Sequence, residues 1–235
     1  MKDTLISFGP LNIPAYVIGG ENNPKKILYL HGYNTSRERQ IAICERINEA
    51  TGRTVILPEY SGHGVSKLEL DQTTPALHGL EALTVYDWLK KTSDETNICV
   101  YGGSYGSYLA AQLCKYRSPG HLILQAPSIL FPNDFYTPWK VLKTRNKVCQ
   151  QLPFEDLIAL NHPLLTRLAE MFSGKITILE MENDTDVPHD TSQTWRHFLP
   201  EARYCLIKDA LHSIIKSSEK AQNDFVDEIK VSLEL

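Results

Sequence analysis

Short apolar runs recur along the chain and alternate with longer stretches in which apolar and polar residues follow a helical period. Within each run both alternating faces are apolar, which is typical of strands in a parallel sheet covered by helices on both sides. Six runs have this character: residues 26–30, 54–57, 97–101, 121–125, 175–181 and 202–207. Two earlier runs, 4–8 and 13–18, are separated by Gly9-Pro10, which predicts an antiparallel hairpin at the first edge. The pattern therefore predicts an α/β fold, a doubly covered and mostly parallel sheet of about eight strands.

The stretches between the runs carry signals for helix starts. Ser36 can cap a first helix, and Thr74 followed by Pro75 indicates the start of a second, because proline fits the first helical position. The predicted inward stripes are Ile41, Cys44 and Ile47 on the first helix, and Ala76, Leu77, Leu80, Leu83 and Trp88 on the second. Further helices are predicted over residues 104–116 and from residue 217 or 218 onward.

One interval breaks this alternation. No strand-like run appears between residues 126 and 174, although most connections between elements are far shorter. The interval holds a proline-dotted aromatic part and two predicted helices, one over 154–160 and one after Asn161. We therefore predict a single domain over residues 1–235, in which residues 127–173 are inserted as a small helical lid.

Composition narrows the classes of function. The 235 residues are 42% hydrophobic and 22% charged, and their net charge of −4 offers no basic surface for nucleic acid. No run of 18 apolar residues is present, so no membrane span is expected. The five cysteines lack the close pairs of a zinc site, and the first residues do not resemble a secretory signal. We expect a cytoplasmic protein with buried free thiols and no metal.

The segment Gly102-Gly103-Ser104-Tyr105-Gly106 follows a predicted strand and opens a predicted helix. A serine in such a G-x-S-x-G turn is held in a strained conformation that exposes its hydroxyl. The flanking glycines are small because the strand and the helix pass close together there. Ser104 is therefore predicted to be a nucleophile, with the backbone N–H of Tyr105 as one donor of an oxyanion hole.

A serine hydroxyl needs a base to remove its proton, and His212 is the best placed of the eight histidines. It follows the run 202–207 after a short loop, at the edge of the sheet where catalytic loops gather. The imidazole in turn needs a carboxylate to orient it and to stabilise its protonated form. Asp184 and Asp186 both follow the run 175–181, so these residues alone leave two candidates.

The chain order of serine, aspartate and histidine resembles that of the α/β-hydrolases, and the resemblance covers nearly the whole chain. In that family the acid loop often reads G-x-x-D-x-x-V-P. Asp184 stands three residues before Val187-Pro188, so the resemblance selects Asp184. Met181 stands where glycine is usual, and Asp186 is kept as the alternative acid.

The family also carries an H-G-x element after the strand that corresponds to residues 26–30. Here the element reads His31-Gly32-Tyr33, so the resemblance makes the N–H of Tyr33 the second oxyanion donor. It leaves His31 a structural residue of this turn, because the catalytic histidine of the family comes late in the chain.

The resemblance implies a cofactor-free serine hydrolase, similar to short-lid carboxylesterases and monoglyceride lipases. Its substrate would be a small-molecule carboxylic ester or thioester, cleaved through an acyl-enzyme. The alternatives are a peptidase or amidase, an acyltransferase, or a ligand-binding protein that has kept the fold without turnover.

The lid aromatic residues indicate an apolar or aromatic acyl pocket formed by Phe131, Phe135, Tyr136 and Trp139. The lid also carries a basic cluster of Lys140, Lys143, Arg145 and Lys147, which is more typical of a solvated face than of a site for an acidic substrate group.

Overall fold

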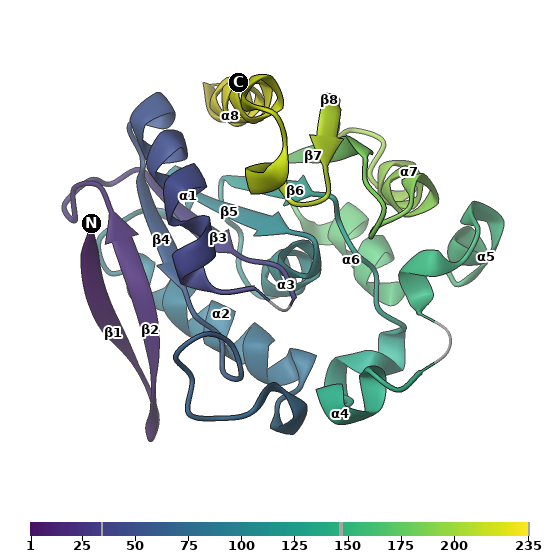
Figure 1. Cartoon of the computed structure of the whole chain (residues 1–235), viewed down its shortest axis with the longest axis horizontal. Helices are drawn as coiled ribbons and strands as arrows, with labels where there is room; N and C mark the ends of the chain where they lie inside the picture. Colours follow the sequence, from purple (N-terminus) through teal and green to yellow (C-terminus); the bar gives the residue numbers. More distant parts are fainter. Residues whose placement is uncertain (34, 146–147, 235) are drawn as a thin grey trace.

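The computed structural model describes residues 1–33, 35–145 and 148–234. Within these residues an eight-stranded sheet runs through the molecule in the order β1-β2-β4-β3-β5-β6-β7-β8 (Figure 1). The strands are β1 (Lys2–Phe8), β2 (Leu11–Ile18), β3 (Lys26–Leu30), β4 (Thr54–Pro58), β5 (Ile98–Gly103), β6 (His121–Gln125), β7 (Lys175–Asn183) and β8 (Arg203–Leu211). β1 and β2 form an antiparallel hairpin, β2 is antiparallel to β4, and the remaining pairs are parallel. The predicted sheet and its antiparallel first edge are confirmed.

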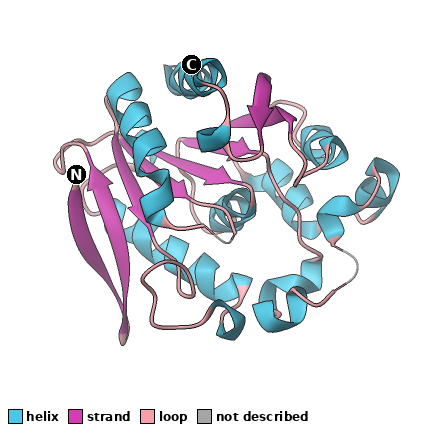
Figure 2. Cartoon of the chain, in the orientation of Figure 1, coloured by secondary structure: helices cyan, strands magenta, loops and turns pink. Residues whose placement is uncertain are grey.

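Helices cover both faces of this sheet (Figure 2). On one face lie α1 (Arg37–Thr51) and α8 (Glu219–Glu234), which pack against each other. On the other face lie α2 (Pro75–Leu89), α3 (Tyr105–Cys114), α6 (Pro163–Met171) and α7 (His189–Phe198). The two layers of helices explain why the central strands are apolar on both sides.

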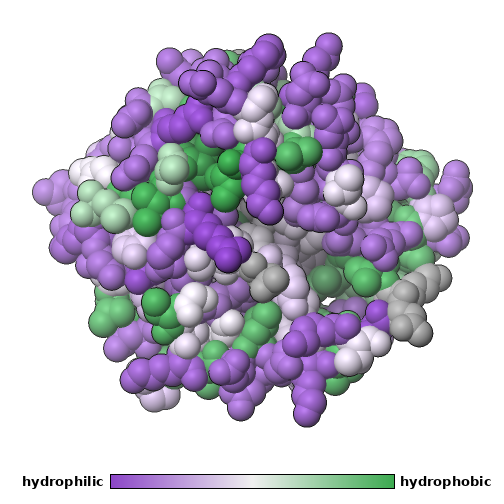
Figure 3. Space-filling view, in the orientation of Figure 1, coloured by the Kyte–Doolittle hydropathy of each residue, from purple (hydrophilic) through white to green (hydrophobic). Residues whose placement is uncertain are grey.

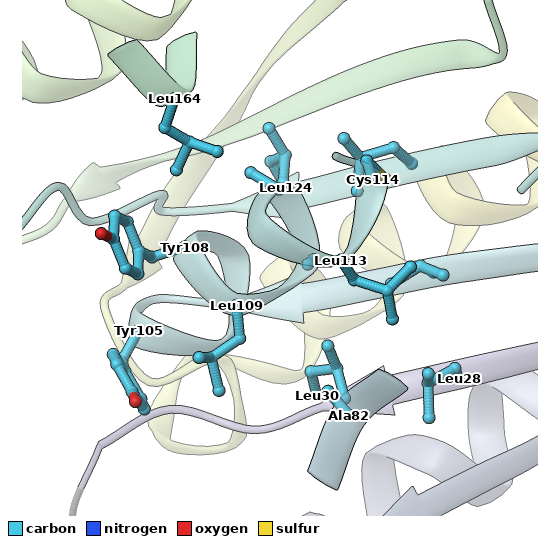
Figure 4. Packing of buried hydrophobic residues seen from close by; sticks show 14 of the residues in the cluster. Leu28, Leu30, Ala82, Tyr105, Tyr108, Leu109, Leu113, Cys114, Leu124 and Leu164 are labelled. Atoms are coloured by element: carbon cyan, nitrogen blue, oxygen red, sulfur yellow. The ribbon is translucent and has the colours of Figure 1, made fainter. Parts of the chain in front are cut away.

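The side chains of β3 point alternately into two hydrophobic cores, one on each face of the sheet. Leu28 and Leu30 belong to the core beneath α2 and α3, and Figure 4 shows Leu30 near Ala82 of α2. Ile27 and Tyr29 point to the opposite face and pack in the core beneath α1 and α8. Successive residues of a strand face opposite sides, so one strand of five buried residues contributes to both layers.

The two last strands extend further than the apolar pattern indicates. β7 reaches Asn183 and β8 reaches Leu211, beyond the expected ends at residues 181 and 207. The ladder shifts register there, and Asp209 adopts a φ of 56° while its N–H donates to the Glu182 carboxylate at 2.8 Å. The ends of these two strands contain polar residues, so the apolar pattern does not reveal them. The expected loop over 208–211 is therefore wrong, and His212 follows β8 directly.

α2 starts as predicted but buries a different face. The Thr74 hydroxyl accepts a hydrogen bond from the Leu77 N–H at 3.1 Å. The predicted inward stripe is wrong, since Leu80 is 54% exposed. The buried positions are Pro75, His78, Gly79, Glu81, Ala82, Val85, Tyr86 and Leu89. His78 and Glu81 bond to Ser61 in the loop after β4, and these contacts favour the observed rotation of the helix.

α1 follows Ser36 as predicted, although the Ser36 side chain makes no capping hydrogen bond. Cys44 and Ile47 are buried, and Ile43 rather than Ile41 completes the buried stripe. The Arg37 side chain is also buried and bonds to Asp3 of β1 at 2.7 Å. This ion pair connects α1 to the antiparallel edge of the sheet.

The interval between β6 and β7 contains only helical elements among its described residues. They are the 3-10 turns η3 (Pro132–Tyr136) and η4 (Cys149–Gln151), and the helices α4 (Trp139–Leu142), α5 (Phe154–Ala159) and α6 (Pro163–Met171). The two predicted helices are confirmed as α5 and α6. Leu164, Leu165 and Leu168 of α6 are buried in the main core, so α6 is part of the layer over the sheet, whereas α4 and α5 lie farther out (Figure 1).

Across the described residues, no helix is both long enough and apolar enough to cross a membrane.

Candidate active site

Ser104 lies in the tight turn between β5 and α3, with φ 53° and ψ −119°. This left-handed region is unusual for a residue with a side chain, and it is the conformation that a nucleophile elbow requires. The neighbouring glycines are needed for space. A Cβ on Gly106 would lie 2.0 Å from the Leu30 carbonyl oxygen, and one on Gly102 would lie 2.3 Å from the carbonyl oxygen of Gly106. The local sequence thus holds a half-exposed serine at the carboxyl end of the central strand.

His212 and Asp184 form a hydrogen-bonded pair beyond the ends of β7 and β8. His212 Nδ1 lies 2.8 Å from Asp184 Oδ2. The other carboxylate oxygen, Oδ1, accepts the backbone N–H groups of Asp186 and Val187, each at 2.8 Å. Because a carboxylate accepts, Nδ1 carries the proton, and Nε2 of the neutral ring is free to accept one from a hydroxyl.

The alternative acid, Asp186, approaches the same imidazole from the other side. Its Oδ2 lies 3.9 Å from His212 Nε2, and its side chain is 68% exposed. The Asp184 side chain is only 6% exposed and is fixed by two backbone donors. The geometry therefore gives Asp184 the orienting position and leaves Asp186 at the solvent-facing side of His212.

Ser104 and His212 line a cavity of about 560 Å³ together with both predicted oxyanion donors, Tyr33 and Tyr105. Tyr105 is the first residue of α3, where backbone N–H groups have no acceptor within the helix. Tyr33 lies in the turn after β3, and a Cβ on the preceding Gly32 would lie 4.0 Å from Ser104 Oγ. The five residues singled out in the sequence as nucleophile, base, acid and donors are thus brought to one end of the sheet.

Of the four predicted pocket aromatics, Trp139 lines this cavity. Its ring lies 4.5 Å from the Tyr33 ring and 5.1 Å from the Tyr105 ring, centroid to centroid. The cavity lining does not include Phe131, Phe135 or Tyr136. Phe131 and Phe135 pack against the core, with Phe135 beside Tyr108, and Tyr136 is 75% exposed.

Other residues of the interval between β6 and β7 supply the apolar wall of this cavity: Leu130, Leu142, Val148 and Cys149. Burial raises the pKa of the Cys149 thiol to about 12, so it stays protonated at neutral pH and is a wall rather than a nucleophile. Lys143 and Arg145 also line the cavity but pair with Asp71 and Asp134, and Lys147 lies outside the described residues.

A larger cavity of about 640 Å³ lies at the amino ends of β6, β7 and β8, near His121 and Phe172. None of the predicted site residues lines it. Within the described ranges, no group of three or more His, Cys, Asp or Glu side chains is placed to hold a metal ion.

A family model described as "Serine aminopeptidase, S33" matches residues 21–216. The chain belongs to this family of α/β-hydrolases. No curated protein sequence matches it.

Solved α/β-hydrolase structures share the whole fold at low identity. Est1E from Butyrivibrio proteoclasticus, solved with ferulic acid, is 17% identical over 97% of this chain and 96% of its own, with a TM-score of 0.75. The esterase Pf2001 of Pyrococcus furiosus is 18% identical over 99% and 91%, with a TM-score of 0.72. The thioesterase domain from the curacin biosynthetic pathway is 13% identical over 100% and 99%, with a TM-score of 0.68.

Next to Tyr33 and Tyr105, this α/β-hydrolase buries two histidines, His63 and His78. His78 Nε2 lies 2.9 Å from the Ser61 carbonyl, and His78 Nδ1 lies 2.9 Å from the Tyr105 hydroxyl. Since a carbonyl only accepts, Nε2 donates and Nδ1 accepts from Tyr105. Burial lowers the pKa of His78 to about 3 and that of His63 to about 4, so both rings are neutral. The two neutral rings pack against the side chains of Tyr33 and Tyr105.

Gln125 is a site residue that the sequence analysis missed. Its carbonyl accepts the Ser104 N–H at 2.8 Å, and its side-chain amide donates to the His212 carbonyl at 3.0 Å. The side-chain oxygen accepts the Tyr101 hydroxyl at 2.9 Å. A glutamine after the apolar run 122–124 is the only sequence signal, and its partners Tyr101, Ser104 and His212 are distant in the chain.

Proposed function

We propose that this α/β-hydrolase is a serine hydrolase that cleaves a small-molecule carboxylic ester or thioester without a cofactor. The observation that carries the proposal is the strained, half-exposed Ser104 in one cavity with a histidine whose Nδ1 is held by Asp184. Such an arrangement activates a hydroxyl that would otherwise be a weak nucleophile. The esterase and thioesterase names among the structural neighbours are consistent with this chemistry.

In the proposed reaction, Ser104 Oγ bonds to the acyl carbon while its proton passes to His212 Nε2. Asp184 stabilises the imidazolium, and the N–H groups of Tyr33 and Tyr105 hold the negative oxygen. The bond to the leaving oxygen or sulfur then breaks, and His212 delivers the proton to that atom. Water repeats the sequence on the acyl-enzyme, releases the acid and restores Ser104.

The acyl group would occupy the cavity beside Trp139, whose apolar wall comes from residues 127–173. We propose this interval as a lid over a single catalytic domain, as the outer position of α4 and α5 suggests. A cavity of about 560 Å³ that combines an apolar wall with several polar and charged residues has room for a medium-chain or aromatic acyl group, which suits it better than acetate.

The test is a series of p-nitrophenyl esters from acetyl to decanoyl, with a feruloyl ester added, assayed on wild type and Ser104→Ala. We expect kcat/KM to rise beyond acetyl, and Ser104→Ala to lose hydrolysis by several orders of magnitude. Activity that survives in Ser104→Ala would exclude Ser104 as the nucleophile. A protein that binds the esters without turnover would instead be a ligand-binding member of the fold.

A peptidase or amidase is the second candidate, because the matching family model is described as a serine aminopeptidase. An amide has a poorer leaving group but would use the same residues. Amino-acid p-nitroanilides assayed beside the esters distinguish the two: faster turnover of an anilide than of the matched ester would favour the peptidase.

A further inference from the structure

A second cavity adjoins Ser104 and His212 on the side away from the lid. It has a volume of about 460 Å³, and both residues line it as they line the first cavity. Its wall includes the polar residues Thr35, which precedes α1, and Arg39 and Gln40 in the first turns of α1. Lys216 joins them from the 3-10 turn Ile214–Lys216. Figure 3 shows a largely hydrophilic face that is hollowed near its centre. The second cavity is thus the more polar of the two, and the first has the larger apolar wall.

The two cations of this second cavity differ from those of the first. Lys143 and Arg145 pair with acidic side chains of the protein. Arg39 and Lys216 are exposed, and among the described residues neither lies within 4.0 Å of a carboxylate oxygen. They are therefore available to an anion from outside.

One carboxylate faces the same cavity, that of Asp186, which lies beside His212 Nε2. Two cations and one carboxylate leave a positive balance when His212 is neutral. An anion bound between Arg39 and Lys216 would gain Coulomb energy, reduced by solvent screening because both side chains are exposed.

The chemistry of the reaction decides which part of a substrate enters this cavity. His212 delivers its proton to the leaving oxygen or sulfur, so the leaving group must lie beside His212. Five consecutive residues, 212–216, line the second cavity, whereas only His212 of these lines the first. The first cavity is then left for the acyl group.

We propose that the second cavity is a leaving-group site that selects alcohols or thiols bearing an anion, a carboxylate or a phosphate, through Arg39 and Lys216. The inference rests on the proposed function and deepens it. The substrate would be an ester or thioester with an apolar acyl group and an anionic leaving group.

The test compares two esters with the same butyryl group, 4-(butyryloxy)benzoate and 4-(butyryloxy)benzamide, which differ in the charge of the leaving group. The readout is the ratio of their kcat/KM values in wild type and in Arg39→Gln/Lys216→Gln. Because both enzymes meet the same two esters, intrinsic differences in leaving-group reactivity cancel. We expect the anionic-to-neutral ratio to fall roughly fivefold in the double variant, and to fall in wild type as salt rises.

A matched control separates local contact from overall charge. Lys91→Gln/Lys208→Gln removes two exposed lysines that do not line either cavity at Ser104, so it changes the net charge equally. Its ratio should equal that of wild type. Equal ratios in wild type and Arg39→Gln/Lys216→Gln, or an equal loss in the control, would overturn the leaving-group site.

A third ester, 4-(butyryloxy)phenyl phosphate, distinguishes the two anions. A larger loss for this ester than for the benzoate in Arg39→Gln/Lys216→Gln assigns the site to phosphate, and the reverse assigns it to carboxylate. If Ser104→Ala hydrolyses the neutral amide-bearing ester as fast as wild type does, or no ester is hydrolysed, the proposed function itself fails. If instead wild type hydrolyses the esters and only the anionic-to-neutral ratio is unchanged by Arg39→Gln/Lys216→Gln, the leaving-group site fails and the proposed function stands.

Discussion

At Ser104 a single residue combines backbone strain with exposure of a hydroxyl. The five-residue motif predicts both, because it stands between a predicted strand and a predicted helix, where a tight turn needs glycine on either side of the serine. His212 could be predicted from its place after a strand, whereas Asp184 is separated from Asp186 only by the resemblance of its loop to that of the α/β-hydrolases. The 2.8 Å contact between them depends on how β7 and β8 end, which apolar patterning does not describe.

The two aspartates of the acid loop should have unequal effects. Asp184→Asn is expected to lower kcat for ester hydrolysis roughly 10³- to 10⁴-fold, as loss of the acid does in serine proteases, because the His212 tautomer is no longer fixed. Asp186→Asn should change kcat less than about tenfold, since its contact with His212 is long and exposed. Steady-state kinetics on one ester measure both, and the reverse order of effects would move the triad acid to Asp186.

The place of Gln125, Arg39 and Lys216 at the site could not be predicted from the sequence. Gln125 and Arg39 lie far in the chain from both Ser104 and His212, and Lys216 follows His212 closely but lies far from Ser104 and Arg39. They join one site because adjacent parallel strands and their loops converge. The aromatic lid residues show the opposite problem. Their composition indicates an apolar pocket, but Phe131 and Phe135 pack against the core instead.

At the scale of elements, the apolar runs predict the strands well because a doubly covered strand has no polar face to confuse the pattern. α2 is the counterexample. Its buried face includes His78 and Glu81, and its exposed Leu80 gives a false apolar stripe. A helix that buries polar groups in hydrogen bonds cannot be oriented by hydrophobicity alone.

The close contact of β3 with the start of α3 makes a sharp prediction about Gly106. Gly106→Ala places a Cβ 2.0 Å from the Leu30 carbonyl oxygen, and we expect it to lower the free energy of unfolding by about 3 kcal/mol. Gly20→Ala is the control, because no atom lies within 4 Å of its added Cβ, and its effect should stay within about 0.5 kcal/mol. Urea unfolding measures both, and equal stabilities would contradict this packing.

At the scale of the whole molecule, the order of strands in the sheet depends on which distant segments of the chain pair with each other. The residue pattern predicts the number of strands but not that β3 lies between β4 and β5. It does predict that an interval without strands interrupts the chain after β6. The structure adds that α6, at the end of this interval, belongs to the core.

Global stability should depend on pH through Glu81, whose burial raises its pKa from 4.5 to about 7. Between these values the folded chain holds a proton that the unfolded chain has lost, so the free energy of unfolding falls as pH rises, by on the order of 3 kcal/mol. Glu81→Gln removes this loss and keeps an acceptor for the Ser61 N–H. We expect the stability of Glu81→Gln relative to wild type to rise by that amount from about pH 4.5 to pH 8, as followed by urea unfolding. A constant difference would contradict the buried carboxylate.

The central claim is that Ser104 is a nucleophile activated by its surroundings. The direct measurement is the mass of wild type and Ser104→Ala after treatment with a fluorophosphonate, followed by mapping of the modified peptide. We predict one adduct per wild-type chain, located on Ser104, and none on Ser104→Ala. Equal modification of both proteins, or an unmodified wild type, would contradict the account.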